Sequence, residues 1–354
     1  MNFSAVIGYA LKIVLAIIIF ALLIIFHELG HFLAARLFKI QVNEFSIGMG
    51  PKIFSAKKGK TLWALRAFPI GGFVSMEGED ELSESDDAFG NKPVYQRIIV
   101  VLAGILFNLL LGFIILCVML ASSSLIPTNR VASFNDNSVS SHYGLQEGDR
   151  ILKIDSLKVY SSYDISLALM RSNDDTVDIT VKRDGKKRLL NNVKFDWQAS
   201  SNTYGRNTKS IIIDFSVKGV RPGLFSVVKN AFLQSISVGR MVYLSLFDLF
   251  AGRFSFSDLS GPIGTVNIVA KSADYGFENL LFISALLSIN IGLFNLFPIP
   301  ALDGGKFLFL IIESIRRKKM SERVESTANF IGFCTLMALV LFVTLFDIFK
   351  IFKG

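Results

Sequence analysis

The sequence predicts a polytopic α-helical membrane protein with four transmembrane helices, a membrane-associated β-element and an inserted α+β domain. Apolar residues make up 51% of the 354 residues, and the mean hydropathy of +0.50 exceeds what a soluble domain of this length needs. Segments 38–96 and 128–197 instead carry alternating patterns typical of strands. Four stretches are long and apolar enough to span a bilayer: residues 3–26, 97–121, 279–297 and 329–349.

The first span is expected to continue as a helix to about residue 37, so that residues 1–37 form one membrane segment. A secretory signal peptide is the alternative for the first 26 residues. Against it, the only early side-chain cation, Lys12, lies inside the apolar run, where it can snorkel toward the interface. No small-residue cleavage site follows, so we interpret this segment as a retained membrane helix.

A metal-binding motif, His27-Glu28-Leu29-Gly30-His31, lies near the C-terminal end of this helix. Helix positions i and i+4 share a face, so both imidazoles can reach one Zn²⁺ at about 2.0–2.1 Å. Zinc lowers the pKa of a bound water to about 7, and Glu28 is placed to take its proton. Ionisable side chains are costly inside a membrane helix, which favours a functional site over Glu28 simply pairing with Arg36.

The third metal ligand is expected from another span, because a catalytic zinc takes three protein ligands and keeps one position open. Segment 279–305 ends in two prolines, which stop the helix, and in two glycines, which allow a sharp turn after Asp303. Asp303 could instead cap the helix 305–316. We predict that His27, His31 and Asp303 bind one zinc ion per chain, with Glu28 as the catalytic residue.

Basic residues set the predicted orientation in the membrane. The helix 306–323, between the third and fourth spans, carries the run Arg316-Arg317-Lys318-Lys319 with little acid nearby. Such clusters remain cytoplasmic. The connection 38–96 and the zinc site are then expected on the cytoplasmic side, whereas residues 122–278 and both termini face outward.

The segment 221–278 contains a further apolar stretch at 225–251 that carries several charged residues. A fifth span here would place Asp303 and His27 on opposite faces of the membrane, which a shared metal ion forbids. We therefore interpret residues 225–251 as an amphipathic or interfacial helix.

The connection 38–96 is predicted to form β-hairpins beside the membrane, followed by an acidic loop. Apolar and other residues alternate around Trp63, and the acid-rich run Glu77–Asp87 has the composition of a solvated loop. Glycines cluster at Gly48, Gly50, Gly71 and Gly72.

Residues 128–197 resemble a bacterial PDZ domain in the order of their elements. Ile151–Ile154 has a strand pattern, Tyr163–Met170 is a short expected helix, and Asp184-Gly185 supplies a hairpin turn. Only one copy is present, and no glycine-rich carboxylate-binding loop is evident.

Together, these motifs resemble those of the site-2 protease family, and the layout is similar to the bacterial RseP-type members. The resemblance is carried by HELGH, by FNLFPIPALDGG at 294–305 and by the intervening PDZ-like domain, and it covers essentially the whole chain. Ile105 and Lys306 depart from the family, which usually has proline and histidine at these places.

The resemblance implies an intramembrane zinc endopeptidase in a bacterial cytoplasmic (inner) membrane. It implies that Asn295 holds the substrate backbone and that the Gly48–Gly72 region pairs with an extended substrate. Asn290, five residues earlier, is a weaker candidate because it need not share the face of Asn295. The implied substrates are transmembrane proteins already trimmed outside the membrane by an upstream site-1 protease, including anti-sigma factors and leftover signal peptides.

Two other classes of protein stay open on the sequence. One is a catalytically silent PDZ-bearing scaffold with a structural metal, and the other is a metal transporter, for which a single metal site is a poor conduction path. The net charge of +8 is explained by basic residues next to membrane spans, so no nucleic-acid partner is expected. The two cysteines, Cys117 and Cys334, cannot form a disulfide framework.

Overall fold

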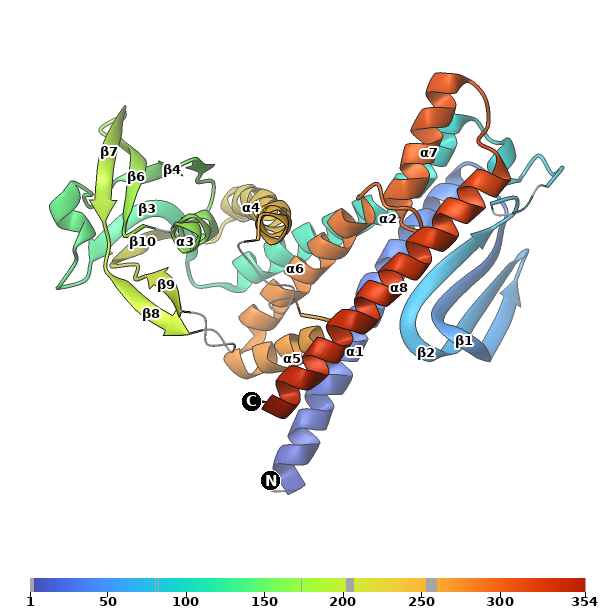
Figure 1. Ribbon diagram of the computed structural model, residues 1–354, viewed down its shortest axis with the longest axis horizontal. Coiled ribbons are helices and arrows are strands. Elements are labelled where there is room, and N and C mark those ends of the chain that lie inside the picture. Colours follow the sequence, from blue (N-terminus) through green and yellow to red (C-terminus); the bar gives the residue numbers. More distant parts are fainter. Residues whose placement is uncertain are drawn as a thin grey trace. The chain divides into compact units, whose positions relative to one another are not determined.

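The chain forms two compact units in the computed structural model, which describes residues 3–79, 81, 83–172, 174–201, 207–252 and 260–353. One unit comprises Met1–Ile115 with Leu246–Lys353, and the other comprises Leu116–Ser245. Long helices and a small curved sheet make up the first unit, and a larger sheet with helices makes up the second (Figure 1).

Four helices in the described part of the chain are long and apolar enough to cross a membrane. They are α1 (Phe3–Leu37), α2 (Val94–Ser122), α6 (Phe277–Asn295) and α8 (Glu322–Lys353). Their places match the four predicted spans. Large apolar side chains stay exposed along them, such as Leu11 on α1 and Phe330 on α8. An apolar surface of this kind suits contact with lipid, so the helices fit the predicted polytopic membrane protein.

Two shorter helices complete the first unit: α5 (Pro262–Ser272) and α7 (Asp303–Arg316), with 3₁₀ turns at Phe89–Asn91 and Ala273–Tyr275. The start of α5 is fixed to α8 by Asp347, a nearly fully buried carboxylate. Its Oδ2 accepts a hydrogen bond of 2.7 Å from the backbone N–H of Gly264. α7 directly follows the sharp turn after α6, as the prolines and glycines of that segment predicted.

The β-element between α1 and α2 is a hairpin that folds back on itself. Its strands are β1 (Val42–Lys58) and β2 (Thr61–Met76). The first half of β1 pairs with both ends of β2, and the second half of β1 pairs with the first half of β2. Three glycines with positive φ, Gly48, Gly50 and Gly71, lie where the two strands bend. The segments therefore lie in the order 72–76, 42–47, 62–65 and 52–58, with 72–76 at one edge.

An aromatic cluster docks this sheet on α1, one residue beyond the HExxH motif. The ring of Phe32 lies 5.6 Å from that of Phe45 and 5.2 Å from that of Trp63, centroid to centroid. Buried apolar side chains extend the same core onto α2 and α7, among them Val42, Met76, Val100 and Leu310. The sheet is thus held against the end of α1 that carries the metal-binding motif.

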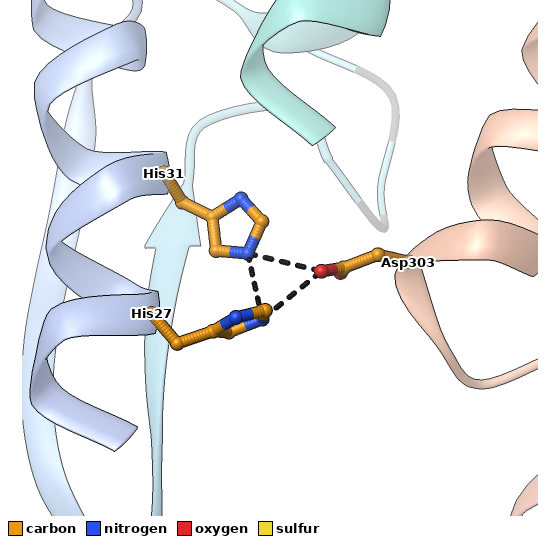
Figure 2. A group of neighbouring side chains, drawn as sticks. All are labelled: His27, His31 and Asp303. Carbon is orange, nitrogen blue, oxygen red and sulfur yellow. Dashed lines mark hydrogen bonds and ion pairs between the residues drawn. The ribbon is translucent and has the colours of Figure 1, made fainter. Parts of the chain in front are cut away.

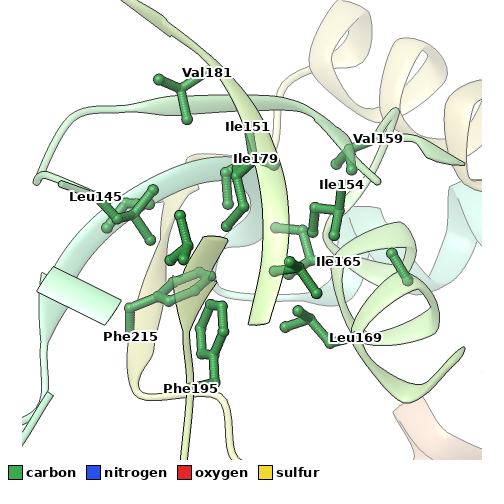
Figure 3. Close-up of a cluster of buried hydrophobic side chains, with 14 residues drawn as sticks. Leu145, Ile151, Ile154, Val159, Ile165, Leu169, Ile179, Val181, Phe195 and Phe215 are labelled. Atoms are coloured by element: carbon green, nitrogen blue, oxygen red, sulfur yellow. The ribbon is translucent and has the colours of Figure 1, made fainter. Parts of the chain in front are cut away.

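The second unit contains an antiparallel sheet in the order β10-β3-β4-β6-β7, with β5 paired to β4. Its core includes Ile151, Ile179, Leu169 and Phe195 (Figure 3). The strands are β3 (Ile126–Phe134), β4 (Arg150–Ile154), β5 (Leu157–Lys158), β6 (Thr176–Arg183), β7 (Lys186–Lys194) and β10 (Phe215–Val220). The remaining elements are the 3₁₀ turn Ser140–Tyr143, helix α3 (Ser162–Arg171) and the separate pair β8 (Trp197–Ser201) and β9 (Asn207–Ile211).

The predicted boundary of the inserted domain at residues 128–197 is too short. Strand β10 lies beyond residue 197 and pairs with β3, with Val220 opposite Ile126. The domain therefore extends to Val220, because β3 would otherwise lose the neighbour that covers its outer edge. The sequence pattern missed β10 because the β8–β9 pair separates it from the rest of the sheet.

Helix α4 (Leu224–Phe250) covers the stretch that we interpreted as interfacial. Among the described helices, it is not one of those apolar enough to span a membrane. Asp164, a fully buried carboxylate at the start of α3, accepts hydrogen bonds from Ser237 Oγ at 2.8 Å and from Arg240 Nη2 at 2.5 Å. One face of α4 is therefore fastened to the inserted domain.

Candidate metal centre

Three side chains that could hold a metal ion converge where α1 meets the turn before α7 (Figure 2). His27 and His31 lie one helical turn apart, and their Nε2 atoms are 3.3 Å from each other. Asp303 Oδ2 lies 3.0 Å from Nε2 of His27 and 3.3 Å from Nε2 of His31. The HExxH spacing and the distant aspartate thus come together as the sequence predicted.

The turn after α6 places Asp303 by close backbone packing. A Cβ atom on Gly304 would lie 2.2 Å from the carbonyl oxygen of Phe297, and one on Gly305 would lie 2.4 Å from that of Ile299. Only glycine fits both positions. Leu302, not Asp303, is the residue before the first turn of α7, so the carboxylate of Asp303 is directed at the imidazoles instead of capping the helix.

The carboxylate of Asp303 is the most accessible of the three converging groups. Its side chain is 23% exposed, compared with 9% and 11% for the side chains of His27 and His31. The cluster is therefore open on the Asp303 side.

The imidazole of His31 is fixed from behind by α2. Its Nδ1 lies 2.9 Å from the carbonyl oxygen of Val100, which can only accept a hydrogen bond. Nδ1 therefore carries the proton, and Nε2 presents its lone pair to the cluster. A Cβ on Gly104 would lie 2.3 Å from His31 Nε2, and one on Gly30 would lie 2.5 Å from the carbonyl oxygen of Ala103. Both glycines are needed for α1 and α2 to approach this closely.

The imidazole of His27 faces a second polar group from α2, the fully buried Asn108. Asn108 Nδ2 lies 3.4 Å from His27 Nδ1, while Asn108 Oδ1 is buried without a hydrogen-bond partner. Rotating the amide by half a turn would let Oδ1 accept a hydrogen bond from His27 Nδ1. His27 Nε2 is then also free to bind a metal ion.

The donor set fits zinc. Two neutral imidazoles and one carboxylate form a recognised catalytic zinc set. Tetrahedral ligands at 2.0–2.1 Å from zinc lie about 3.3 Å from one another. The three separations here are 3.0, 3.3 and 3.3 Å. Asp303 Oδ2 is a buried acceptor that receives no hydrogen bond within the described residues, as expected for an atom reserved for a cation.

A pocket of about 400 Å³ opens onto this cluster and gathers most of the other predicted site residues. Glu28 and Asn295 line it, together with Gly71, Gly72 and the rest of the edge segment 72–76 except Ser75. Gly48, Gly50 and Asn290 do not belong to its described lining. Gly48 and Gly50 lie at the bend of β1, outside the pocket lining. A Cβ atom on Gly48 would lie 2.5 Å from the carbonyl oxygen of Phe68.

An ion pair that the sequence did not reveal borders the same pocket. Lys306 Nζ donates a hydrogen bond of 2.6 Å to Glu79 Oε1, which joins α7 to the loop after β2. Both side chains line the pocket beside Asp303. Nothing in the spacing of residues 79 and 306 predicts the contact, because it depends on the fold of the acidic loop.

Comparison with known proteins agrees with this chemistry. The family model of Peptidase family M50 matches residues 15–339. A candidate zinc metalloprotease of Clostridium acetobutylicum is 34% identical over 339 residues, which cover 95% of this chain and 97% of that protein. The regulator of sigma-W protease RasP of Bacillus subtilis is 32% identical over 419 aligned residues, which cover 95% of this chain and 98% of that protein.

A zinc-type donor set at the end of a membrane helix, with these relatives, defines a membrane-embedded zinc metalloprotease. The chain belongs to peptidase family M50, the site-2 proteases.

The close approach of α1 and α2 can be tested through Gly104. We expect Gly104→Ala to push the His31 ring out of place and to lower zinc affinity by about 10–100-fold, as for other losses of a supporting contact. Zinc content and affinity of the purified protein would be measured by elemental mass spectrometry after dialysis against graded chelator. Gly8→Ala is the matched control, because a Cβ there meets nothing within 4 Å. Unchanged zinc affinity in Gly104→Ala would contradict the packing argument.

Proposed function

We propose that this protein is an intramembrane endopeptidase that hydrolyses peptide bonds within transmembrane segments of other membrane proteins. The observation that supports this most is a single pocket lined by the three metal-binding side chains, by Glu28 and by an unpaired strand edge. The pocket lies at the C-terminal end of the membrane helix α1. A protease acting on soluble chains has no need of a site at this depth.

We assign zinc binding to His27, His31 and Asp303, and proton transfer to Glu28. When bound, zinc polarises the scissile carbonyl and lowers the pKa of water. Glu28 lines the same pocket, and its Cγ lies close to Gly72 of the edge segment. From there its carboxylate can hold the proton removed from water and pass it to the nitrogen of the departing peptide.

The edge segment 72–76 offers a way to hold an unwound substrate. A transmembrane helix hides each peptide bond in its internal hydrogen bonds, so hydrolysis requires local unwinding. Within the described sheet, this segment has a strand partner on one side only. An extended substrate added to its free edge would regain the lost backbone hydrogen bonds. Asn295, across the pocket, offers both a donor and an acceptor for the substrate backbone.

For the substrates, we propose membrane proteins already trimmed outside the membrane by an upstream protease, including anti-sigma factors and remnant signal peptides. The Bacillus subtilis relative is named a regulator of sigma-W protease, which supports the anti-sigma class for this chain.

The catalytic role of Glu28 is tested by Glu28→Gln in the full chain reconstituted in lipid nanodiscs. We expect normal zinc content and loss of cleavage of a single-span test substrate, by at least about 100-fold, because the general base is removed. Glu278→Gln, at an exposed position of α6, is the matched control. Continued cutting by Glu28→Gln would sink the mechanism.

The same variant separates the enzyme from a silent scaffold with a structural metal. A scaffold would lose its fold or its binding when Asp303→Asn releases the metal, yet would be unaffected by Glu28→Gln. The enzyme requires both residues for cleavage, while its substrate binding survives in Glu28→Gln.

The strand edge is tested by single prolines at Phe73 and Val74. Neighbouring residues of an edge strand point their N–H groups in opposite directions, so one proline removes a bond within the sheet and the other removes a free donor. We expect the variant that removes the free donor to keep the thermal stability of the parent and to lose cleavage by about fivefold, since one net hydrogen bond is worth about 1 kcal/mol. Full activity in both variants would rule out strand addition.

The proposed orientation places the zinc site and Lys318 toward the cytoplasm and the inserted domain outside. The two native cysteines are free, so each is first replaced by alanine. Cysteines introduced at Lys318 and at the exposed Tyr160 should then react with a membrane-impermeant maleimide from opposite faces of oriented vesicles. Labelling of both from one face would refute this topology.

The inserted domain, which we propose to be a PDZ domain, has two candidate roles: exclusion of bulky untrimmed proteins, or capture of a peptide end. We favour exclusion. A deletion must run from Ile126 to Val220, because removing only 128–197 leaves β10 without β3. Under exclusion, the deletion variant should cleave untrimmed proteins that the full chain rejects. Under capture, it should lose activity on trimmed ones.

A further inference from the structure

A second pocket, of about 440 Å³, lies wholly within the second unit and is lined by four cationic side chains. Arg130 comes from β3, Arg150 from β4, Lys218 from β10 and Lys229 from the second turn of α4. The rest of the lining is neutral: Thr128, Asn129, Tyr160, Val220, Phe225, Ser226, Asn230 and Leu233. Neither the metal centre nor the proposed proteolysis uses these residues.

The four cations have no acidic partner among the described residues. The nearby buried carboxylates are engaged elsewhere, Asp149 with Arg183 and Asp164 with Arg240. Arg130 and Arg150 moreover lie directly opposite each other on paired strands. Like charges in this register are destabilising. Their repulsion would be relieved by an anion bound between them.

The arrangement is also organised for an anion. The buried Asn129 orients Arg150, since its Oδ1 accepts a hydrogen bond of 3.2 Å from Arg150 Nε. Asn129 is itself fixed by a bond of 2.8 Å from its Nδ2 to the carbonyl oxygen of Ile151. Phe225 and Ser226, in the first turn of α4, also line the pocket, so the positive end of a 27-residue helix dipole borders it.

The lining of this pocket is close in the sequence to the membrane helix α2. The membrane helix α2 ends at Ser122, and Thr128 of the lining follows six residues later. Six extended residues reach at most about 20 Å. Strand β10 returns to the same end of the sheet, where Val220 pairs with Ile126, and α4 starts there. The lining is thus built from the part of the domain that adjoins the end of α2.

The rim of the pocket carries exposed apolar side chains. Leu125, Leu224 and Phe225 are 53%, 87% and 79% exposed. The stripe continues along α4 at helical spacing, with Val228, Phe232, Ile236, Tyr243 and Phe247 all at least 40% exposed. Water is a poor solvent for such a stripe, whereas the interfacial region of a bilayer accepts it.

We propose that this pocket binds the phosphate headgroup of an anionic phospholipid, with α4 lying in the membrane interface. The phosphate lies among the four cations and the first turn of α4, and the acyl chains follow the apolar stripe away from it. A free anion would use the cations but leave the stripe in water. A peptide carboxylate would leave the exposed apolar side chains and part of the set of four cations unused. The lipid is the occupant that matches both features.

The test compares two triple variants of the full chain in nanodiscs that contain phosphatidylcholine and phosphatidylglycerol in equal amounts. One variant is Arg130→Gln, Lys218→Gln, Lys229→Gln, which keeps Arg150 on Asn129. The matched control, Lys186→Gln, Lys187→Gln, Arg188→Gln, removes the same charge from exposed positions of β7. Native mass spectrometry measures which lipids stay bound after release from the disc.

We expect the parent and the control to retain phosphatidylglycerol, and the pocket variant to retain it at least about tenfold less, given the contribution of each cation near a lipid surface. Amide exchange of residues 218–230 should rise in the pocket variant only, while that of β6 is unchanged. Because Arg130 opposes Arg150, Arg130→Gln alone should not lower thermal stability. A strong loss of thermal stability in Arg130→Gln would contradict the inferred repulsion between Arg130 and Arg150.

Three results would overturn the proposal: equal retention in both triple variants, equal protection of 218–230 by inorganic phosphate alone, and binding of a peptide carboxylate that phosphatidylglycerol does not displace. Glu28→Gln should bind the lipid like the parent. A failure of the lipid-binding proposal can therefore be distinguished from a failure of the proposed proteolysis.

Discussion

The structure of the metal site depends on how closely two membrane helices approach each other. A Cβ atom on Gly30 or Gly104 would force α1 and α2 apart, and without one the carbonyl of Val100 reaches His31. A helix carbonyl normally bonds within its own helix, so its use here at 2.9 Å fixes both the ring and its tautomer. Two histidines on one helix face are held in place as candidate metal ligands by a second helix that supports them from behind.

The aspartate reaches the same point by a different means. Gly304 and Gly305 let the chain fold tightly onto the carbonyl oxygens of Phe297 and Ile299, just after α6. Asn329 of α8 holds this turn from outside, since its Oδ1 accepts a hydrogen bond of 3.1 Å from the N–H of Ala301. Close backbone packing on one side and supported imidazoles on the other bring the three candidate ligands together.

Patterns within short stretches of the sequence predicted the features that depend on neighbouring residues alone. Four spans, the i, i+4 pair of histidines and the sharp turn at Asp303 all follow from composition, helical spacing, proline and glycine. Contacts made in three dimensions could not be read in this way. Asn108 behind His27, the ion pair of Lys306 with Glu79, and the return of β10 to β3 each join residues far apart in the chain. The glycines of the β-element were noticed as a cluster, but that they fold one hairpin into four segments required its register.

The fold-back of that hairpin also explains why the β-element can serve the site at all. A simple two-stranded ribbon is marginally stable and would leave both edges open. The fold-back places segment 42–47 between two partner segments. Phe45 and Trp63 anchor the sheet on Phe32 of α1. Segment 72–76 is left as the edge beside the three candidate metal ligands. The β-element is thus packed firmly against α1, and at segment 72–76 it keeps unpaired backbone groups that an extended chain can join. An edge of this kind is a liability in water, because any exposed strand can pair with it. Under the proposed function, the chains that join this edge are membrane segments that unwind beside it.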